Sequence, residues 1–247
     1  MTFEKYDAAR RHFPADLESQ KFEFRRPSYL KYLDELKGMD YAFEDFLHYF
    51  PCFVGDMTLS RMFCLYEAYK LTLGISGHIA DVGMFKGASS FLFSKLANIF
   101  EPNSLVQVHG FDWFKGNQPG ITETQIKAGA GKESYSRLKQ LRDLQGLDNI
   151  LKIHNLDLTA DLGGFFEKYS HLTFKLIFMD AGMYEVVSRS LPYFWERLSK
   201  SGIIIFDQYN FDVAPGETKA VNEFFRNLDV EIKTFPFSWM PTAYIQK

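Results

Sequence analysis

An apolar run followed by a glycine-containing turn and a helical pattern constrains this chain more than any other segment. It reads Ile79-Ala-Asp-Val-Gly-Met-Phe-Lys-Gly-Ala-Ser-Ser90, and a largely apolar stretch from Phe91 to Phe100 follows it. Glycines let the backbone approach a ligand closely, and a helix N-terminus offers free N–H groups to a carboxylate or a phosphate. The segment therefore predicts the strand, turn and helix that hold nucleotide-like ligands in α/β proteins.

The spacing of the two glycines narrows the kind of ligand. Gly83 and Gly87 stand in the pattern D-x-G-x-x-x-G-x-S. This pattern differs from the G-x-G-x-x-G of NAD-binding folds and from the G-x-x-x-x-G-K-[ST] of P-loops. It argues against an NAD oxidoreductase and against a P-loop protein, and it is similar to the first motif of class I S-adenosylmethionine (SAM) methyltransferases.

Composition and charge exclude several classes of partner. The 247 residues suit one sizeable α/β domain, or a domain with an appendage, and the formal charge of −3 gives no electrostatic case for nucleic acid or anionic membrane. No apolar run approaches the ~20 residues of a membrane span, and the N-terminus has no apolar signal-peptide core. We expect a cytoplasmic protein that binds a small-molecule acceptor, with a homodimer as a reasonable assembly.

Strand and helix patterns alternate from residue 78 onward. The strand candidates are mostly continuous apolar runs, as expected when helices cover both faces of a parallel sheet. The fold class is therefore α/β, with a doubly wound, mostly parallel, Rossmann-like sheet. The strands are predicted at His78–Val82, Leu105–Phe111, Ile150–His154, Lys175–Met179 and Gly202–Phe206, and the helices at Ser89–Phe100, Lys132–Leu144, Leu162–Tyr169, Tyr184–Ser199 and Lys219–Asn227.

The segments outside this alternation lead to separate predictions. Residues 1–74 read as a helical N-terminal extension, and residues 75–247 as the ligand-binding domain. The glycine-rich segment 113–132 is either a mobile lid or a passive surface loop. Val230–Phe235 and Ala243–Gln246 predict a closing antiparallel pair. Aromatic side chains of the extension either wall an acceptor pocket or, as the favoured alternative, pack in a core or a dimer interface: Tyr41, Phe43, Phe46, Tyr49 and Phe50.

The first three strand candidates end in polar side chains that meet at one edge of the predicted sheet. Asp81 lies one residue before the end of the first strand, close to the glycine turn. Asp112 ends the second, where a carboxylate accepts hydrogen bonds from ribose hydroxyls in related sites, although it can also cap a turn. His154 and Asp157 follow the third. Asp157 either faces an adenine ring or starts a turn, and these alternatives stay open.

The fourth and fifth strand candidates deliver two acids to the same edge. Asp180 follows one strand, and Asp207 with Gln208 follows the other. Two carboxylates and an amide oxygen suit a hard cation such as Mg²⁺. A metal so placed orients a substrate hydroxyl and lowers its pKa. The alternative is that both acids cap the turns that follow them and bind no metal.

With these residues identified, positions 58–228 resemble the macrocin O-methyltransferase family, SAM-dependent enzymes that methylate sugar hydroxyls of natural products. The family motif E-C-G-V-W-R-G-G-S-S is matched by D-V-G-M-F-K-G-A-S-S at residues 81–90. The other matches, in order along the chain, are F-D-S-F-E-G at residues 111–116, D-G-D-x-Y-E-S at residues 180–186, P-x-L-x-x-G-G-x-x-x-x-D-D-Y at residues 195–209, and [RK]-[RK]-A-V-x-x-[FY] at residues 218–224.

The resemblance implies SAM as the cofactor and assigns roles to the strand-end residues. Gly83, Gly87 and Ser89 would contact the methionine part of SAM, and Asp112 its ribose. The resemblance also implies that Asp180 and Asp207 are metal ligands, which Gln208 would join. The full set of residues predicted to bind the cofactor is Asp81, Gly83, Met84, Gly87, Ser89, Asp112 and Asp157.

Two departures from the family pattern affect the predicted chemistry. Gly182 stands where the family has the second acid of D-G-D, and Gln208 where it has the second acid of D-D. The missing acid leaves the general base open. The predicted catalytic residues are Asp180 and His154. His154 is chosen among the candidates for the base because histidine has the most suitable unperturbed pKa. The candidates for the base are His154, Tyr184, Glu185 and Asp212.

The sequence thus predicts a SAM-dependent O-methyltransferase that modifies a hydroxyl of a small molecule, a sugar or a glycosylated metabolite, with assistance from Mg²⁺. One alternative is a hydroxylase-like tailoring enzyme on the same fold. Another is a non-catalytic SAM-binding module, which the lost acid at Gly182 keeps open.

Overall fold

The protein is described from a computed structural model, and the description is of residues 24–116, 133–212, 214–237 and 239–247. It contains two compact units, Met1–Ser60 and Arg61–Lys247. The boundary therefore differs from the one predicted after residue 74, because side chains from Cys64 onward already belong to the core of the second unit. Within the described ranges, the helices are too short or too polar to span a lipid bilayer.

The first unit is built from short helices. They are α1 (Arg26–Lys37), α2 (Phe43–His48), the 3₁₀ turn η4 (Phe50–Cys52) and the start of α3 (Asp56–Leu71). The Asp45 side chain accepts a hydrogen bond from the Ala42 N–H at 3.0 Å, which satisfies one donor at the start of α2. The rings of Tyr41 and Phe46 lie 5.0 and 4.5 Å from that of Phe53, so these two aromatics pack within the unit.

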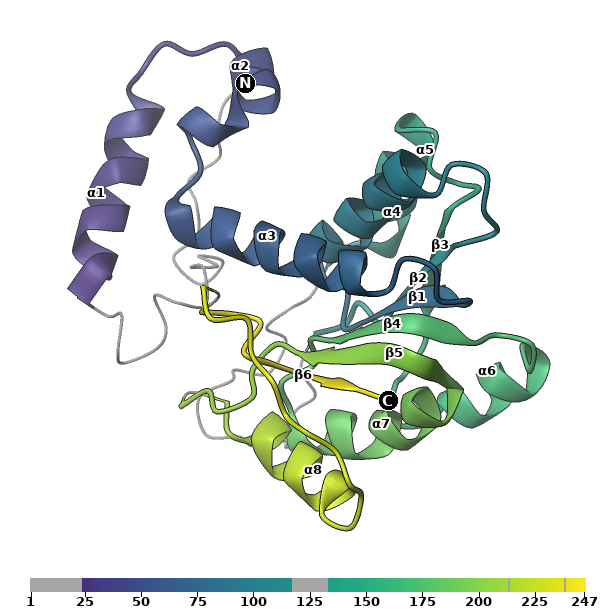
Figure 1. Ribbon diagram of the computed structural model, residues 1–247. Coiled ribbons are helices and arrows are strands. Elements are labelled where there is room, and N and C mark those ends of the chain that lie inside the picture. Colours follow the sequence, from purple (N-terminus) through teal and green to yellow (C-terminus); the bar gives the residue numbers. More distant parts are fainter. Residues whose placement is uncertain (1–23, 117–132, 213, 238) are drawn as a thin grey trace. The chain divides into compact units, whose positions relative to one another are not determined.

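The second unit contains a six-stranded sheet in the order β3-β2-β1-β4-β5-β6 (Figure 1). The first five strands are parallel, and β6 runs antiparallel to β5. This topology confirms the doubly wound, mostly parallel sheet that the alternating pattern predicts. The strands are β1 (His78–Val82), β2 (Val108–Asp112), β3 (Leu151–Asn155), β4 (Phe174–Met179), β5 (Leu198–Phe206) and β6 (Ala243–Gln246).

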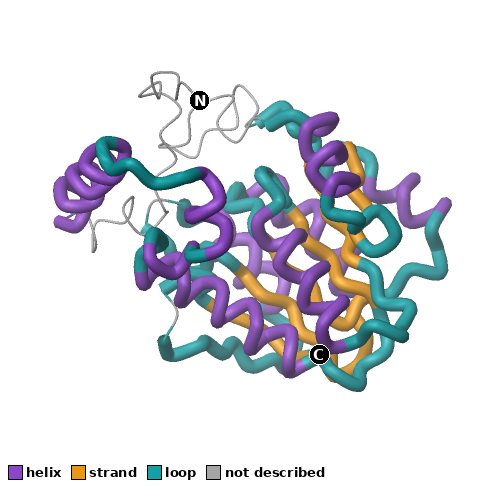
Figure 2. Tube along the Cα trace, turned by 90° about the horizontal axis from the view of Figure 1, so that it is seen from above, coloured by secondary structure: helices purple, strands orange, loops and turns teal. Residues whose placement is uncertain are grey.

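Helices cover both faces of this sheet and create two apolar layers. The α3 segment from Arg61 on, α4 (Ala88–Phe100) and α5 (Tyr135–Leu144) pack on one face. On the other lie α6 (Leu162–Lys168), α7 (Tyr184–Arg197) and α8 (Gly216–Phe225). Seen from above, purple helices pass in front of the orange strands (Figure 2). Successive strand residues alternate between the layers, which explains why the runs are apolar throughout.

The C-terminal strand has two antiparallel partners, one of which the sequence predicts. β6 lies against β5, with Ile245 opposite Ile204, and a single bridge between Lys233 and Tyr244 joins it to the segment at residues 230–235. The predicted antiparallel pair is therefore present as one bridge, in which Lys233 and Tyr244 exchange two backbone hydrogen bonds, and β5 is the main partner of β6. All four residues of β6 pair with residues of the buried β5. Residues 231–234 are exposed, and only Phe235 of that segment is buried, where its ring stacks on Tyr244. The predicted lid lies mostly at residues 117–132, outside the described ranges.

The order of the strands reverses between β1 and β4, and ligands of doubly wound folds bind at such a point. There the Asp180 N–H donates to the Val82 carbonyl at 2.8 Å. The next residue, Gly83, has φ +90°, and a Cβ added to it would lie 2.8 Å from the Asp180 carbonyl carbon. The backbones that follow β1 and β4 therefore touch, and only glycine fits between them.

Replacing Gly83 tests this close approach. We expect Gly83→Ala to lower the free energy of unfolding by about 3 kcal/mol or more, because backbone strain and a clash with the Asp180 carbonyl add together. Gly74→Ala is the matched control: its φ is +82°, but a Cβ there meets nothing within 4 Å. The control should lose only about 1–2 kcal/mol. Equal losses in chemical denaturation would contradict the close approach.

Candidate active site

The loop between β1 and α4 presents an uncapped helix N-terminus at this edge of the sheet. The N–H groups of Gly83 and Met84 both donate to the Phe111 carbonyl, at 2.9 and 3.2 Å, which fixes the loop to the end of β2. Gly87, in the left-handed conformation, is the N-cap of α4, and no side chain caps the helix there. The first N–H groups of α4 have no partner inside the helix, so the helix can bind an anionic group at this end.

The Asp81 side chain is hydrogen-bonded to the first turn of α4. It is fully buried, and Oδ2 accepts hydrogen bonds from the hydroxyls of Ser89, at 2.7 Å, and Ser90. Oδ1 has no hydrogen-bond partner among the described residues. Burial raises the pKa of Asp81 to about 6, and the two serine hydroxyls oppose that rise. Asp81 and Ser89 therefore shape the loop, whereas a direct contact with a ligand stays a prediction.

Met84 and Asp112 are both engaged in packing or turn formation. Met84 is buried in the core, so only its backbone is available to a ligand. The Asp112 carboxylate accepts hydrogen bonds from the N–H groups of Phe85, at 2.9 Å, and Phe114, at 2.7 Å. These bonds match the turn-capping alternative. Each oxygen retains a second lone pair, so contact with a ribose stays a prediction for Asp112.

Asp157 has the geometry of a residue that starts a turn. Its Oδ1 accepts hydrogen bonds from the N–H of Thr159, at 2.8 Å, and from its hydroxyl, at 2.6 Å. Asp157 therefore does start a turn, as one of the two alternatives predicts, and it lies just after the end of β3. The two roles are compatible, and contact with adenine stays a prediction.

His154 lies in an aromatic cluster, apart from Asp180. Its Nε2 is 3.0 Å from Nδ1 of His109, and its ring stacks on Phe111 with centroids 4.8 Å apart. Burial and then Lys152 lower its pKa to about 4. Its strand, β3, is three places from β4 in the sheet, a lateral separation of about 14 Å. The structure therefore does not bring the two predicted catalytic residues together.

Asp180 and Asp207 do meet, and a cation already joins them. Nη2 of Arg61, on α3, donates to Oδ2 of Asp180 at 2.9 Å, and Nη1 donates to Oδ1 of Asp207. The guanidinium also lies over the ring of Phe178, 5.3 Å from its centroid. Asp180 and Arg61 each expose 26% of their side chains, whereas Asp207 exposes 3%. One acid is therefore accessible at this site and the other is covered.

Burial and charge act in opposite directions on this group of three. Burial raises the pKa of the Asp207 carboxyl, and the guanidinium of Arg61 opposes that rise. Burial also acts to lower the pKa of Arg61, but the attraction of Asp207 and then Asp180 outweighs it and the pKa is raised. Arg61 therefore stays charged at any ordinary pH, as arginine does.

Gln208 and Gly182 share the space beside these acids. A Cβ added to Gly182 would press on Oε1 of Gln208 and lie 3.2 Å from its Cδ. That Oε1 atom is buried and has no hydrogen-bond partner in the described parts of the chain. The backbone N–H of Gln208 donates to Oε1 of the buried Glu217 at 2.6 Å. The two departures from the family pattern are thus sterically linked, because the amide occupies the room of a side chain at position 182.

The described residues do not fit a magnesium ion at this place. Sequence reasoning correctly brings Asp180, Asp207 and Gln208 to one edge, but both carboxylates are bound to Arg61. Among the described residues, no cluster of three or more His, Cys, Asp or Glu side chains has the geometry of a metal site. A divalent cation and the guanidinium would compete for the same oxygens and repel each other. At the predicted metal site the structure therefore has a pair of acids bridged by arginine.

Arg61 is the residue that sequence reasoning missed, although a signal existed. Cys64, Leu65 and Ala68 follow it at i+3, i+4 and i+7, and all three are buried. This spacing places Arg61 on the buried face of α3. A buried arginine is costly unless an acid pairs with it, and the acids predicted at the strand ends were candidates for that pairing. Glu217, in the first turn of α8, was missed as well.

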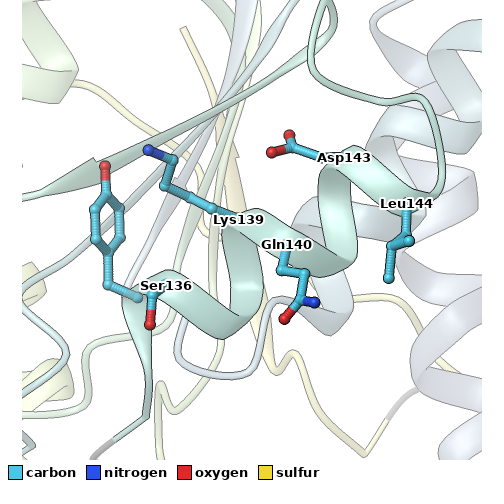
Figure 3. A pocket seen from close by; sticks show the side chains of 6 residues that line it. Ser136, Lys139, Gln140, Asp143 and Leu144 are labelled. Carbon is cyan, nitrogen blue, oxygen red and sulfur yellow. The ribbon is translucent and has the colours of Figure 1, made fainter.

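Figure 3 shows a pocket on the surface of α5. Its lining residues all belong to that one helix: Tyr135, Ser136, Lys139, Gln140, Asp143 and Leu144. None of them is among the predicted site residues, and we place no part of the active site there.

Comparisons with known proteins give a consistent result. Residues 80–209 match the model of a family described as a methyltransferase domain. Curated protein sequences yield no match. Among solved structures, the chain is similar to CalS11, described as a calicheamicin methyltransferase, with a TM-score of 0.79 and 18% identity over 92% of this chain and 93% of that one. The likeness shows the fold.

Two further structures share this fold. The apo structure of CalS11, described as a TDP-rhamnose 3'-O-methyltransferase, has a TM-score of 0.72 and 18% identity over 96% of both chains. The O-methyltransferase NovP has a TM-score of 0.60 and 18% identity over 76% of this chain and 80% of that one.

The pH dependence of stability tests the buried state of Asp81. Its pKa rises from 3.8 to about 6 on folding, so the native state binds more protons in this range and stability falls as pH rises from about 4 to about 6. The shift corresponds to at most roughly 2–3 kcal/mol. Asp81→Asn should lose this part of the dependence in denaturant titrations at several pH values. Asp148→Asn, at an exposed position, is the control. An unchanged slope in Asp81→Asn would contradict the assignment.

Proposed function

The chain belongs to the family of proteins with a methyltransferase domain, and from that membership we propose that it is a SAM-dependent O-methyltransferase acting on a hydroxyl of a small molecule. The family match, residues 80–209, spans the glycine loop and both acids of the site. It confirms the methyltransferase class predicted from the sequence. The observation that carries the proposal is the uncapped N-terminus of α4, beside the acid pair at the point where the strand order reverses.

The loop after β1 suits the anionic end of the cofactor. Gly87 places no side chain over the first N–H groups of α4, so these donors are left for the methionine carboxylate of SAM. Asp112, at the end of the neighbouring β2, would use its remaining lone pairs for the ribose hydroxyls. Asp157 would then lie toward the adenine ring. Asp81 and Ser89 support the loop from within.

The acid pair suits the acceptor. Bound SAM supplies a sulfonium-linked methyl group that a hydroxyl oxygen can attack. Asp180 is the more exposed acid of the pair, so it is the group that a substrate hydroxyl can reach and to which that hydroxyl can give its proton. Asp207 is buried and serves to hold Arg61. We assign no catalytic role to His154, which packs among aromatic rings.

A sugar hydroxyl is the acceptor class that we propose. The motifs shared with the macrocin-type enzymes support it, as does the fold shared with a protein described as a TDP-rhamnose 3'-O-methyltransferase. The methyltransferase family match favours methyl transfer over the hydroxylase-like alternative. Assistance by Mg²⁺ is not part of the proposal, because Arg61 binds both acids. The homodimer and the cytoplasmic location stay predictions.

A charge placed at the α4 N-terminus tests the cofactor site. Gly87→Asp should weaken the binding of S-adenosylhomocysteine about tenfold more than Gly87→Asn does, because the added carboxylate repels the ligand's own. The two variants meet the same neighbours, Phe91 and Met84, so the comparison isolates the charge. Calorimetric titration measures both affinities. Equal affinities in the two variants would place the ligand carboxylate elsewhere.

Turnover tests the reaction itself. Methyl-labelled SAM and a panel of nucleotide-linked sugars should give product in which the label is on a sugar oxygen. Asp180→Asn should lower kcat by about 10²–10⁴-fold, because the amide cannot accept the hydroxyl proton. Its affinity for S-adenosylhomocysteine should change far less. Wild-type protein that binds the cofactor product but methylates no hydroxyl would support the non-catalytic alternative instead.

A further inference from the structure

The acids at the ends of β4 and β5 are held by an organic cation that is built into the fold. Arg61 donates from two different nitrogens to two different carboxylates, so its planar fork bridges the two strand ends. Its helix is anchored in the core by Cys64 and Leu65, which are buried on the same face. The cation is therefore a fixed part of the second unit.

Charge and space around the pair agree with a monovalent partner. The family that the sequence resembles has four acids at positions 180, 182, 207 and 208, whereas this chain has two, Asp180 and Asp207. Gly182 and Gln208, which replace the other two, fill one space together. Two carboxylates with one guanidinium carry a formal charge of −1, and four carboxylates with a divalent ion carry −2, so the loss of two acids goes with the lower charge of the cation.

The coordination that magnesium needs also favours a guanidinium over Mg²⁺ at this site. Mg²⁺ requires six oxygen ligands in near-ideal octahedral geometry and gives up its waters reluctantly. A guanidinium needs only two carboxylates in its plane and tolerates an aromatic face, which Phe178 supplies here. Bridged in this way, the half-buried Asp180 has a fixed orientation at the edge where the loop of Gly83 touches it.

We propose that Arg61 takes the place of a divalent cation in this site, so that methyl transfer is metal-independent and Arg61 is the residue that positions Asp180 toward the acceptor hydroxyl. The proposal rests on the proposed function for the identity of the reaction. The claim about the cation does not require turnover and is tested separately. Arg61 acts through Asp180 and is a positioning residue.

Removing the guanidinium should create a metal site where the full-length wild-type protein has none. Oxygen-rich sites bind Mn²⁺, whose free and bound forms are distinguished by electron paramagnetic resonance. We expect wild-type protein to leave added Mn²⁺ free and Arg61→Ala to bind about one Mn²⁺ per chain, through the released oxygens of Asp180 and Asp207 and the amide oxygen of Gln208. Mn²⁺ should also raise the melting temperature of Arg61→Ala and leave that of the wild type unchanged.

Matched variants separate charge from side-chain loss. Arg61→Lys keeps the positive charge and should bind no Mn²⁺. Arg189→Ala removes an exposed arginine that pairs with Glu185 on α7, and it should behave as wild type. Adding Asp207→Asn to Arg61→Ala should abolish the gained binding. If Arg61→Ala fails to fold, Arg61→Gln is used with the same expectations, since it also removes the charge.

The outcomes are distinct. Mn²⁺ binding by the wild type that Asp207→Asn abolishes would overturn the proposal, and so would an Arg61 variant, folded and uncharged at this position, that binds no Mn²⁺. Wild-type turnover that is unchanged by a chelator would support it. If no acceptor is methylated at all, the proposed function fails, while the Mn²⁺ titrations still decide whether Arg61 stands in the place of a cation.

Discussion

Two carboxylates brought to one edge of a parallel sheet need a positive charge, and the ion pairs of Arg61 supply it. The register of β4 with β5 sets Met179 beside Phe206, so the next residues, Asp180 and Asp207, are neighbours by construction. Asp207 is almost fully buried, and leaving such an acid without a partner costs several kcal/mol. Arg61, on α3, binds both acids, and Asp180 is the more exposed of the two.

The glycine loop and the acid pair form one structural unit. Gly83 touches the backbone of Asp180, and the N–H of Asp180 is bonded to Val82, the last residue of β1. A cofactor carboxylate at α4 and an acceptor hydroxyl at Asp180 would therefore be held by adjoining backbone segments. Reacting groups that are held so rigidly lose little entropy at the reaction step, which is what methyl transfer requires of the protein.

The sequence allowed the fold to be predicted more fully than the site, for physical reasons. Continuous apolar runs and the glycine turn are local patterns, and they located the ends of the five parallel strands to within four residues. The partner of β6 depends on which edge is free, and that is not local. The acids were found because parallel strands end together, but Arg61 lies more than a hundred residues away in sequence from both. Its helical spacing marked it as buried, and only the fold shows which acids it meets.

A crystal structure with S-adenosylhomocysteine, grown in the presence of Mn²⁺ and measured at the manganese absorption edge, tests the central claim most directly. The account predicts the ligand carboxylate at the N-terminus of α4 and Arg61 bridging Asp180 and Asp207, with no anomalous peak between the acids. An anomalous peak between the two carboxylates, with Arg61 turned away, would contradict the replacement of the metal by arginine. Density for the ligand at any other edge of the sheet would contradict the methyltransferase site itself.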